Sequence, residues 1–495
     1  MKNNDGGTIE IKPYTVDGEG ANLTLMDALK AAGLPVDGIN LSMVNKMMEE
    51  QMPIDKTSLN QMYQLVQDNK DINVTTLVEL KRLGIEINQV NAAQFENYAN
   101  DKQAITIAMD SLIDELPNAL SAEDLSMYKL VTQARDILNI VTEGLPEEAF
   151  ISSEASDMSQ YEAIMRDNQS APVVKKHFNI TELFESLNSV SGESQDIHTT
   201  QKINDAPAID TILLQENETK SNTIGFLLSD KQIEELNEQV RMLLPNLQEN
   251  NISLYSEDSS VVGILNDIKS MLENTPANAD TLRHLFSGEA FKLMLKEALE
   301  QQWMIKPGDL EKNPKKLDGL YDKIEKQITN MEIILKTSGV VNPKAEALAD
   351  NIRGNIEFMN QINEAYTYVQ VPLKMNEKNA SGQLYVYTNK KSMSNPDKEL
   401  SAFLHLDLEH LGGTDVSIKM LHRKVTTNFY LDSDESYALV KQFLPVLEKR
   451  LQDKGYNCEL NVNSDSKQMN FVAGFLKKDL PPTGQVHRYS FDIRA

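Results

Sequence analysis

Residues 403–412 have the sequence FLHLDLEHLG, in which Leu404, Leu406 and Leu408 alternate with polar side chains. Such a period of two is typical of a β-strand that buries one of its faces. The same period recurs in five further segments, namely residues 366–374, 382–388, 416–421, 425–431 and 458–462. The sequence therefore predicts a C-terminal α+β domain over residues 365–475, in which a small sheet packs against one long helix.

The long helix of this domain is expected over residues 434–454, because apolar residues recur there at helical spacing and Gly455 follows. We expect its inward side to consist of Leu439, Phe443, Leu447 and Leu451. The strands over 416–421 and 425–431 leave room for little more than His422 and Arg423 between them. This spacing predicts a tight turn at these two residues.

Upstream of residue 365 the apolar residues follow a helical period instead. We expect helices over residues 24–32, 229–245, 260–272, 279–303 and 315–337, with Ser229 and Gln232 as a capping box. In the last of these segments apolar residues alternate spacings of four and three, which is typical of a helix–helix seam. Pro343 suits the first turn of a following helix, so the two helices would form a long antiparallel hairpin. Packing within the chain and homodimerisation both explain such a seam.

A short unit repeats in the N-terminal part of the chain. Residues 35–44 align with residues 53–62 and, more loosely, with residues 86–95. Each copy places an Asp or Asn directly after an apolar residue, where it can cap the helix that starts there. These capping residues are Asp37, Asp55 and Asn88. We interpret the copies as stacked helices that pack together, with a peptide-binding groove as the alternative.

Composition divides the chain into six parts. We predict a disordered arm (1–22), a helical repeat domain (23–142), a disordered linker (143–223), a helical domain with the hairpin (224–364), the α+β domain (365–475) and a tail (476–495). The linker is rich in Ser, Asn, Gln, Glu and Asp, and its main apolar cluster is residues 178–187. The predicted fold class is mainly α with a C-terminal α+β domain.

The charge of the chain restricts its partners. Its 48 Lys and Arg stand against 74 Asp and Glu, a net charge of −26. Residues 365–495 hold 17 basic and 15 acidic residues, so the acidic excess lies upstream of the α+β domain. Phosphate binding needs clustered cations, so a nucleic-acid partner is disfavoured.

Features of the sequence also bear on location. Cys458 is the single cysteine, which excludes disulfides within the chain. The N-terminus is polar, and no apolar run is long enough to span a membrane. We therefore expect a cytoplasmic chain without direct membrane insertion. Export by a route that reads no cleaved signal peptide stays open.

A search for chemical motifs finds no phosphate-binding loop, no nucleophile elbow and no zinc-protease motif. His405, Asp407 and His410 are the candidates for a metal site, because His405 and Asp407 share one face of the predicted strand. A solvated strand face explains the same residues. We expect no catalytic residue, no metal and no cofactor.

The C-terminal domain resembles that of flagellar hook-length control proteins. The resemblance lies in residues 404–412 (LHLDLEHLG), the strand at 415–418 (DVSI) and the helix with LPVL at 444–447. That family has L-x-L-x-P-x-x-L-G, and Leu408 stands where many members have proline. The long helical region upstream is similar to that of members from Gram-positive bacteria.

The resemblance implies regulation of flagellum assembly. Such proteins are exported through the flagellar type III apparatus, and their C-terminal domain contacts the cytoplasmic domain of the export gate membrane protein and switches its substrate specificity. Hook or hook-cap subunits are further partners of such proteins. Carried onto matching positions, the switch residues are Val416, Ile418, Leu444 and Leu447. The alternatives are a cytoplasmic helical scaffold or adaptor and, more remotely, a metal-dependent hydrolase.

Overall fold

The computed structural model describes most of the chain outside its two ends and one long central segment. The described residues are 19–145, 223–243, 254–274, 278–312, 314–317, 319–337, 342–365, 367–375, 378–387, 397, 399–408 and 411–463. They form two compact units that divide between Gln103 and Ala104. The predicted arm up to residue 18, most of the predicted linker with its cluster at 178–187, and the predicted tail lie outside the described residues.

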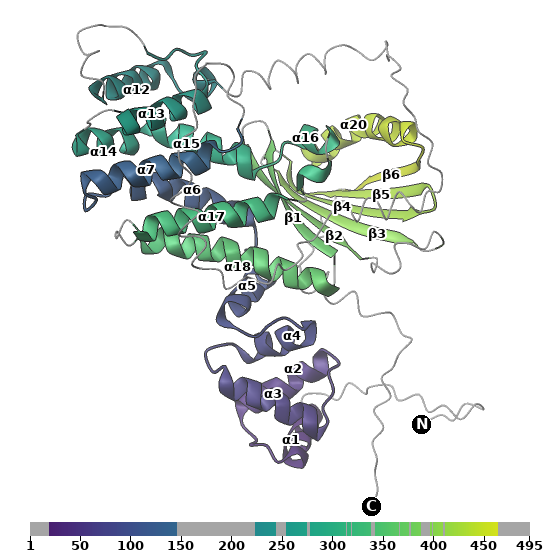
Figure 1. Cartoon of the computed structure of the whole chain (residues 1–495). Helices are drawn as coiled ribbons and strands as arrows, with labels where there is room; N and C mark the ends of the chain where they lie inside the picture. Colours follow the sequence, from purple (N-terminus) through teal and green to yellow (C-terminus); the bar gives the residue numbers. More distant parts are fainter. Residues whose placement is uncertain are drawn as a thin grey trace, which may run out of the picture. The chain divides into compact units, whose positions relative to one another are not determined.

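The N-terminal unit consists of helices in the described range: α1 (Glu19–Ala32), α2 (Gly38–Glu49), α3 (Lys56–Asp68), α4 (Val74–Leu83) and α5 (Gln89–Ala99). Figure 1 shows them in purple and blue. Helix α1 begins at Glu19, so the start predicted for the first helix is wrong. Gly20 does not prevent the earlier start, since a glycine inside a helix costs only about 1 kcal/mol relative to alanine.

The predicted helix caps of these segments are present. The side chains of Asp37, Asp55 and Asn88 each accept a hydrogen bond from the backbone N–H three residues further on, at 2.8, 3.1 and 2.8 Å. Asn73 caps α4 in the same way by accepting from the Thr75 N–H at 2.9 Å. The structure therefore adds a fourth capped helix that the sequence alignment of the copies did not include.

A buried cluster of four charges joins α2 to α4. Lys46 Nζ lies 2.7 Å from Glu50 and 2.6 Å from Glu79, and Arg82 Nε lies 3.2 and 2.9 Å from the same two carboxylates. Although burial opposes its charge, hydrogen bonds and Coulomb attraction from Glu50 and Glu79 raise the pKa of Lys46. The two cations and two anions balance, so neither buried carboxylate is left without a partner.

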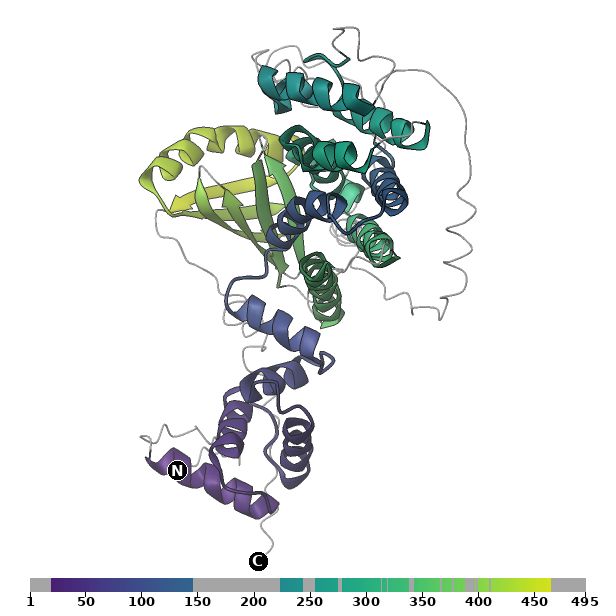
Figure 2. The ribbon, with the colours of Figure 1, turned by 90° about the vertical axis from the view of Figure 1, so that its left-hand side faces the viewer.

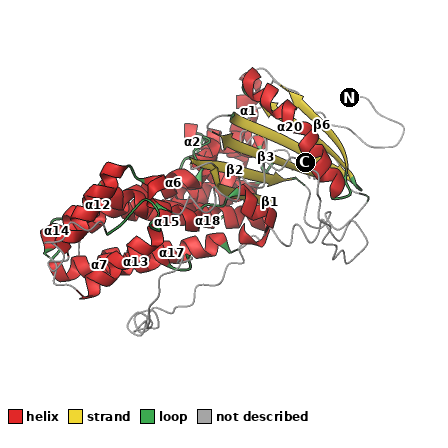
Figure 3. Cartoon of the chain, turned by 90° about the horizontal axis from the view of Figure 1, so that it is seen from above, coloured by secondary structure: helices red, strands yellow, loops and turns green. Residues whose placement is uncertain are grey.

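The second unit begins with a body of helices. They are α6 (Ile105–Leu120), α7 (Met127–Thr142), α11 (Ile224–Leu227), α12 (Asp230–Leu243), α13 (Val261–Asn274), α14 (Ala279–Ser287), α15 (Glu289–Trp303), α16 (Pro307–Lys312), the 3-10 turn η2 (Pro314–Leu317), α17 (Leu320–Thr337) and α18 (Pro343–Ala365). The predicted capping box is present in part: the Ser229 N–H and Ser229 Oγ both donate to Gln232 Oε1, at 2.9 and 2.8 Å. In Figure 3 these helices form the red body beside the yellow sheet.

The single helix predicted over residues 279–303 is wrong, because α14 and α15 are separated at Gly288. The backbone there is extended, with φ −67° and ψ 143°. A Cβ atom at this position would come within 2.8 Å of the Gln239 side chain. The Gln239 side chain of α12 thus lies close to Gly288, at the point where the chain passes from α14 to α15.

The predicted helical hairpin is present as α17 and α18, which pack against each other. Its seam residues Tyr321, Ile324, Ile328, Met331 and Leu335 are all buried. Packing within the chain thus accounts for the seam.

Six strands form one sheet in chain order. They are β1 (Thr367–Met375), β2 (Lys378–Val386), β3 (Leu400–Leu408), β4 (Gly412–Leu421), β5 (Lys424–Leu431) and β6 (Asn457–Asn463). Neighbouring strands are antiparallel except β5 and β6, which are parallel and joined by α20 (Asp434–Asp453). The turn at His422 and Arg423 is confirmed, with φ of 55° at His422. The predicted class, mainly α with a C-terminal α+β part, is confirmed.

The register gives the sheet one apolar and one polar face, because paired residues lie on the same side. The apolar face includes Val369, Val371, Leu373, Leu384, Leu404, Leu406, Val416, Ile418, Phe429, Leu460 and Val462. The opposite face, which we call the polar face, carries Gln370, Lys374, Gln383, His405 and Asp415 together with the buried rings of Tyr368, Tyr385 and Phe403. Helix α20 packs against β6 and β5 (Figure 2).

Polar side chains of β1 and β2 bind the helical body. Lys374 is buried and pairs with Glu297 and Glu300 of α15, the latter at 3.1 Å. Gln370 Oε1 accepts from the Ile105 N–H at the start of α6 at 2.9 Å, and Asn379 donates to Glu300 at 2.8 Å. We call these contacts the polar anchor. They fix the sheet to the helices through groups that cannot stay buried without partners.

The polar anchor bears on the domain boundaries. The structure groups residues 104–469 as one compact unit, which differs from the predicted divisions after residues 142 and 364. Helices α6 and α7 pack against α18, α15 and α17, and β1 is buried along almost its whole length. The period switch near residue 366 therefore marks a change of secondary structure inside one unit.

We predict that Lys374→Met destabilises this unit by roughly 3–5 kcal/mol, because Glu297 and Glu300 would keep buried charges without their partner. Urea unfolding measures the change. The control is Lys419→Met, whose ammonium forms an exposed pair with Glu399 at 3.3 Å. We expect it to shift stability by less than about 0.5 kcal/mol. Equal unfolding midpoints for the two variants would contradict the role of the polar anchor.

Candidate partner-binding site

The four residues singled out from the sequence lie on β4 and α20. Val416 and Ile418 share the apolar face of the sheet, the same face as the β5 and β6 residues that α20 covers. Val416 is only 5% exposed, whereas Ile418 is half-buried. Leu444 and Leu447 of α20 are half-buried as well. Val416 is thus part of the core, and the other three lie at its margin.

The start of α20 is held by the loop that leads into β4. Ser433 caps the helix by accepting from the Ser436 N–H at 3.1 Å, and Ser436 Oγ donates to the Leu411 carbonyl at 3.0 Å. Asp432 accepts from the Gly413 N–H at 3.1 Å. A Cβ atom at Gly413 would come within 2.7 Å of the Asp432 carboxylate. The glycine thus lets the loop approach closely enough to orient the helix.

The exposed side of α20 carries an apolar stripe, which we define as Leu439, Phe443 and Val446. Their exposed fractions are 47%, 56% and 50%. The prediction that Leu439 and Phe443 face inward is therefore wrong. Apolar residues cover more than half of the circumference of α20, so spacing alone does not select the side that meets the sheet. Sequence reasoning missed the stripe for the same reason.

His405 lies between two carboxylates on the polar face of the sheet. Its Nδ1 is 2.5 Å from Asp415 and its Nε2 is 3.2 Å from Asp407. Although burial opposes the charge, hydrogen bonds and Coulomb attraction from both carboxylates raise the pKa of His405 to about 10. A hydrogen bond from His405 lowers the pKa of Asp407. The arrangement holds an imidazolium ion between β3 and β4 at neutral pH.

The described residues give no support to the alternative of a metal site. His410 lies outside the described residues, and those that are described contain no group of three side chains suited to hold a metal ion. A protonated His405 has no lone pair left for a cation. Across the described helices, none is long and apolar enough to cross a membrane.

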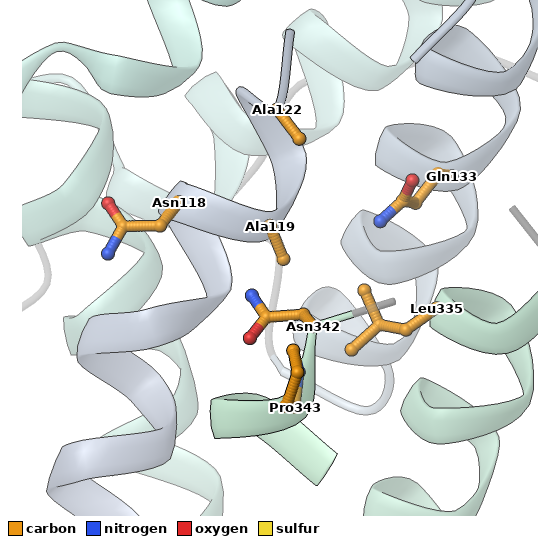
Figure 4. Close-up of a pocket in the computed structure, with 7 residues that line it drawn as sticks. All are labelled: Asn118, Ala119, Ala122, Gln133, Leu335, Asn342 and Pro343. Carbon is orange, nitrogen blue, oxygen red and sulfur yellow. The ribbon is translucent and has the colours of Figure 1, made fainter. Parts of the chain in front are cut away.

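A cavity of about 180 Å³ lies in the helical body, away from these residues (Figure 4). It is lined by Asn118, Ala119, Ala122, Gln133, Leu335, Asn342 and Pro343. Its polar groups are neutral amides, so the lining offers neither a nucleophile nor a titratable acid or base.

We predict that His405 stabilises the fold in a pH-dependent way. The folded pKa of about 10 lies above the ordinary value of 6.5. The contribution is therefore complete below about pH 6.5 and is lost as the pH rises through about 10. The difference in unfolding free energy between the unaltered chain and His405→Gln should shrink between pH 6.5 and pH 10. A difference that stays constant or grows over this range would contradict the ion pair.

We predict that Val416→Asp unfolds the domain or destabilises it by roughly 3–5 kcal/mol, because the new carboxylate is buried without a partner. Trp303 is the single tryptophan and is buried, so its fluorescence reports urea unfolding. Val446→Asp, the same change in the apolar stripe, should shift stability by about 0.5 kcal/mol or less. A stable Val416→Asp chain would show that this face of β4 is not core.

Comparison with known proteins agrees with this part of the fold. Residues 388–471 match the family model described as flagellar hook-length control protein FliK. No curated protein and no solved structure matches the chain. The matched segment contains β3, β4, β5, α20 and β6, whereas β1 and β2 precede it. Residues 388–471 are thus similar to the domain that this family model describes, in agreement with the resemblance seen in the sequence motifs.

Proposed function

We propose that this protein controls flagellar hook length and switches the substrate specificity of type III export through its C-terminal domain. The observation that carries the proposal is the family match over residues 388–471, which coincides with the strands and helix that present the apolar stripe. The family role is regulatory, and the proposal assigns no catalytic step to the chain.

In this proposal the partner is the cytoplasmic domain of the export gate membrane protein. The apolar stripe supports a docking role, since exposed apolar side chains that gather on one helix favour protein contact. Val416, Ile418, Leu444 and Leu447 take a different part in the switch. The burial of Val416 suits a core residue rather than one that touches a partner, and the partial burial of the other three suits residues that position α20 against the sheet.

The upstream part of the chain would then serve length control and export. Passage through the flagellar apparatus without a cleaved signal peptide, and contact with hook or hook-cap subunits, belong to this proposal. The capped helices of the N-terminal unit are a feature that a cytoplasmic scaffold or adaptor would share. That second candidate predicts normal hooks when the gene is deleted, whereas hook-length control predicts overlong hooks.

We predict that Phe443→Asp in the chromosomal gene gives overlong hooks without filaments while the purified variant melts like the unaltered chain. The charge would remove an apolar contact at the partner surface without entering the core. Electron microscopy of isolated hooks measures their length. Tyr128→Asp is the matched control, because Tyr128 is 80% exposed and lies outside the matched domain. Normal hooks and filaments with a stable Phe443→Asp protein would overturn the role of the apolar stripe.

A further inference from the structure

The two edges of the sheet differ. At the β1 edge, Ile305 forms a backbone bridge beside Leu373. The Ile305 N–H donates to the Pro372 carbonyl at 2.8 Å, and the Ile305 carbonyl accepts from the Lys374 N–H at 3.0 Å. At the other edge, β6 pairs with β5 on one side, and no described strand pairs with its second side. The β6 edge is therefore open within the part of the chain that the structure describes.

The register shows which backbone groups face the open edge. The Asn457 N–H donates to the Arg423 carbonyl at 2.8 Å, so the backbone of Asn457 points toward β5. In a parallel ladder every second residue points the same way. Cys458, Leu460 and Val462 therefore direct their N–H and C=O groups outward.

The β6 edge lacks the features that usually prevent pairing with another chain. Natural edge strands carry proline, lysine, bulges or inward-pointing charges. Residues 457–463 have the sequence NCELNVN, with no proline, glycine or lysine, and Glu459 as the single charge. That carboxylate already pairs with Lys424 at 3.1 Å. The edge can therefore accept an added strand without leaving a charge unpaired.

The side chains around the edge specify the chemistry of such a strand. Cys458, Leu460 and Val462 are half-buried on the face that α20 covers, so residues added beside them would meet apolar groups. On the opposite face, Asn461 offers an amide group, and the exposed Glu459 carboxylate can take a second cation beside Lys424. A segment that alternates apolar residues with hydroxyl or basic residues matches both faces.

We propose that the open edge of β6 binds an extended segment of about seven residues from the protein that docks on this domain, by strand addition. The segment alternates apolar residues with hydroxyl or basic ones, and its backbone pairs with Cys458, Leu460 and Val462. The inference rests on the proposed function, because it describes how the same partner is held. Main-chain hydrogen bonds to the added strand would contribute affinity beyond that of the apolar stripe.

The test measures hydrogen exchange and binding with the full chain and the purified cytoplasmic domain of the export gate. In the free chain the amides of residues 458, 460 and 462 should exchange fast, whereas those of 459 and 461 are bonded to β5 and should exchange slowly. Binding should slow the first three. Slow exchange of all these amides in the free chain would show that the chain itself covers the edge, and would overturn the proposal.

Two variants at one position separate the edge from the rest of the surface. Val462→Pro removes an outward N–H without breaking a bond to β5, whereas Val462→Thr keeps it. Both should melt like the unaltered chain. Val462→Pro should weaken binding by about tenfold or more, and Val462→Thr should bind normally. Equal binding by both would overturn strand addition while leaving the proposed function intact, whereas no binding by the unaltered chain would overturn the proposed function and this inference together.

Discussion

The buried pairing of Lys374 with Glu297 and Glu300 is the contact on which the architecture of the larger unit depends. Polar groups cover one face of β1 and β2, so these strands can be buried only where partners meet those groups. Helices α6, α15 and α18 supply such partners. One example is the buried hydrogen bond that Gln370 Nε2 donates to Asn355 Oδ1 of α18 at 3.1 Å. An apolar sheet face and a polar sheet face thus receive different covers. Helix α20 packs against β5 and β6, and the polar side chains of β1 and β2 bind the helical body.

This anchor explains how a small family domain is incorporated into a long chain. The family match begins at residue 388, after β1 and β2. These two strands extend the sheet and carry the contacts to the helices, so the matched strands are held at one end only. The opposite end carries α20 with its apolar stripe and the open edge of β6. The surfaces proposed for partner binding thus lie on the part of the sheet farthest from the anchor in strand order.

Local patterns predicted the elements of this fold, and long-range contacts decided what the patterns left open. Alternation at residues such as Leu404 and Leu406 predicted the strands, because a half-buried strand shows its burial in its sequence. The caps at Asp37 and Asp55 followed from single residues beside a helix start. The inward side of α20 did not follow, since both Phe443 and its neighbour Leu444 are apolar. The pairing of Lys374 with α15 was likewise hidden, because charges far apart in sequence show no shared period.

The central claim is that the polar anchor makes the helical body and the family domain one cooperative unit. Urea unfolding followed in the same samples by two probes tests it most directly. Trp303 fluorescence reports the helical body, and protection of β5 amides from hydrogen exchange reports the family domain. The account predicts one midpoint for both probes. A β5 strand that stays protected after Trp303 has become exposed would contradict it and would show that the family domain folds on its own.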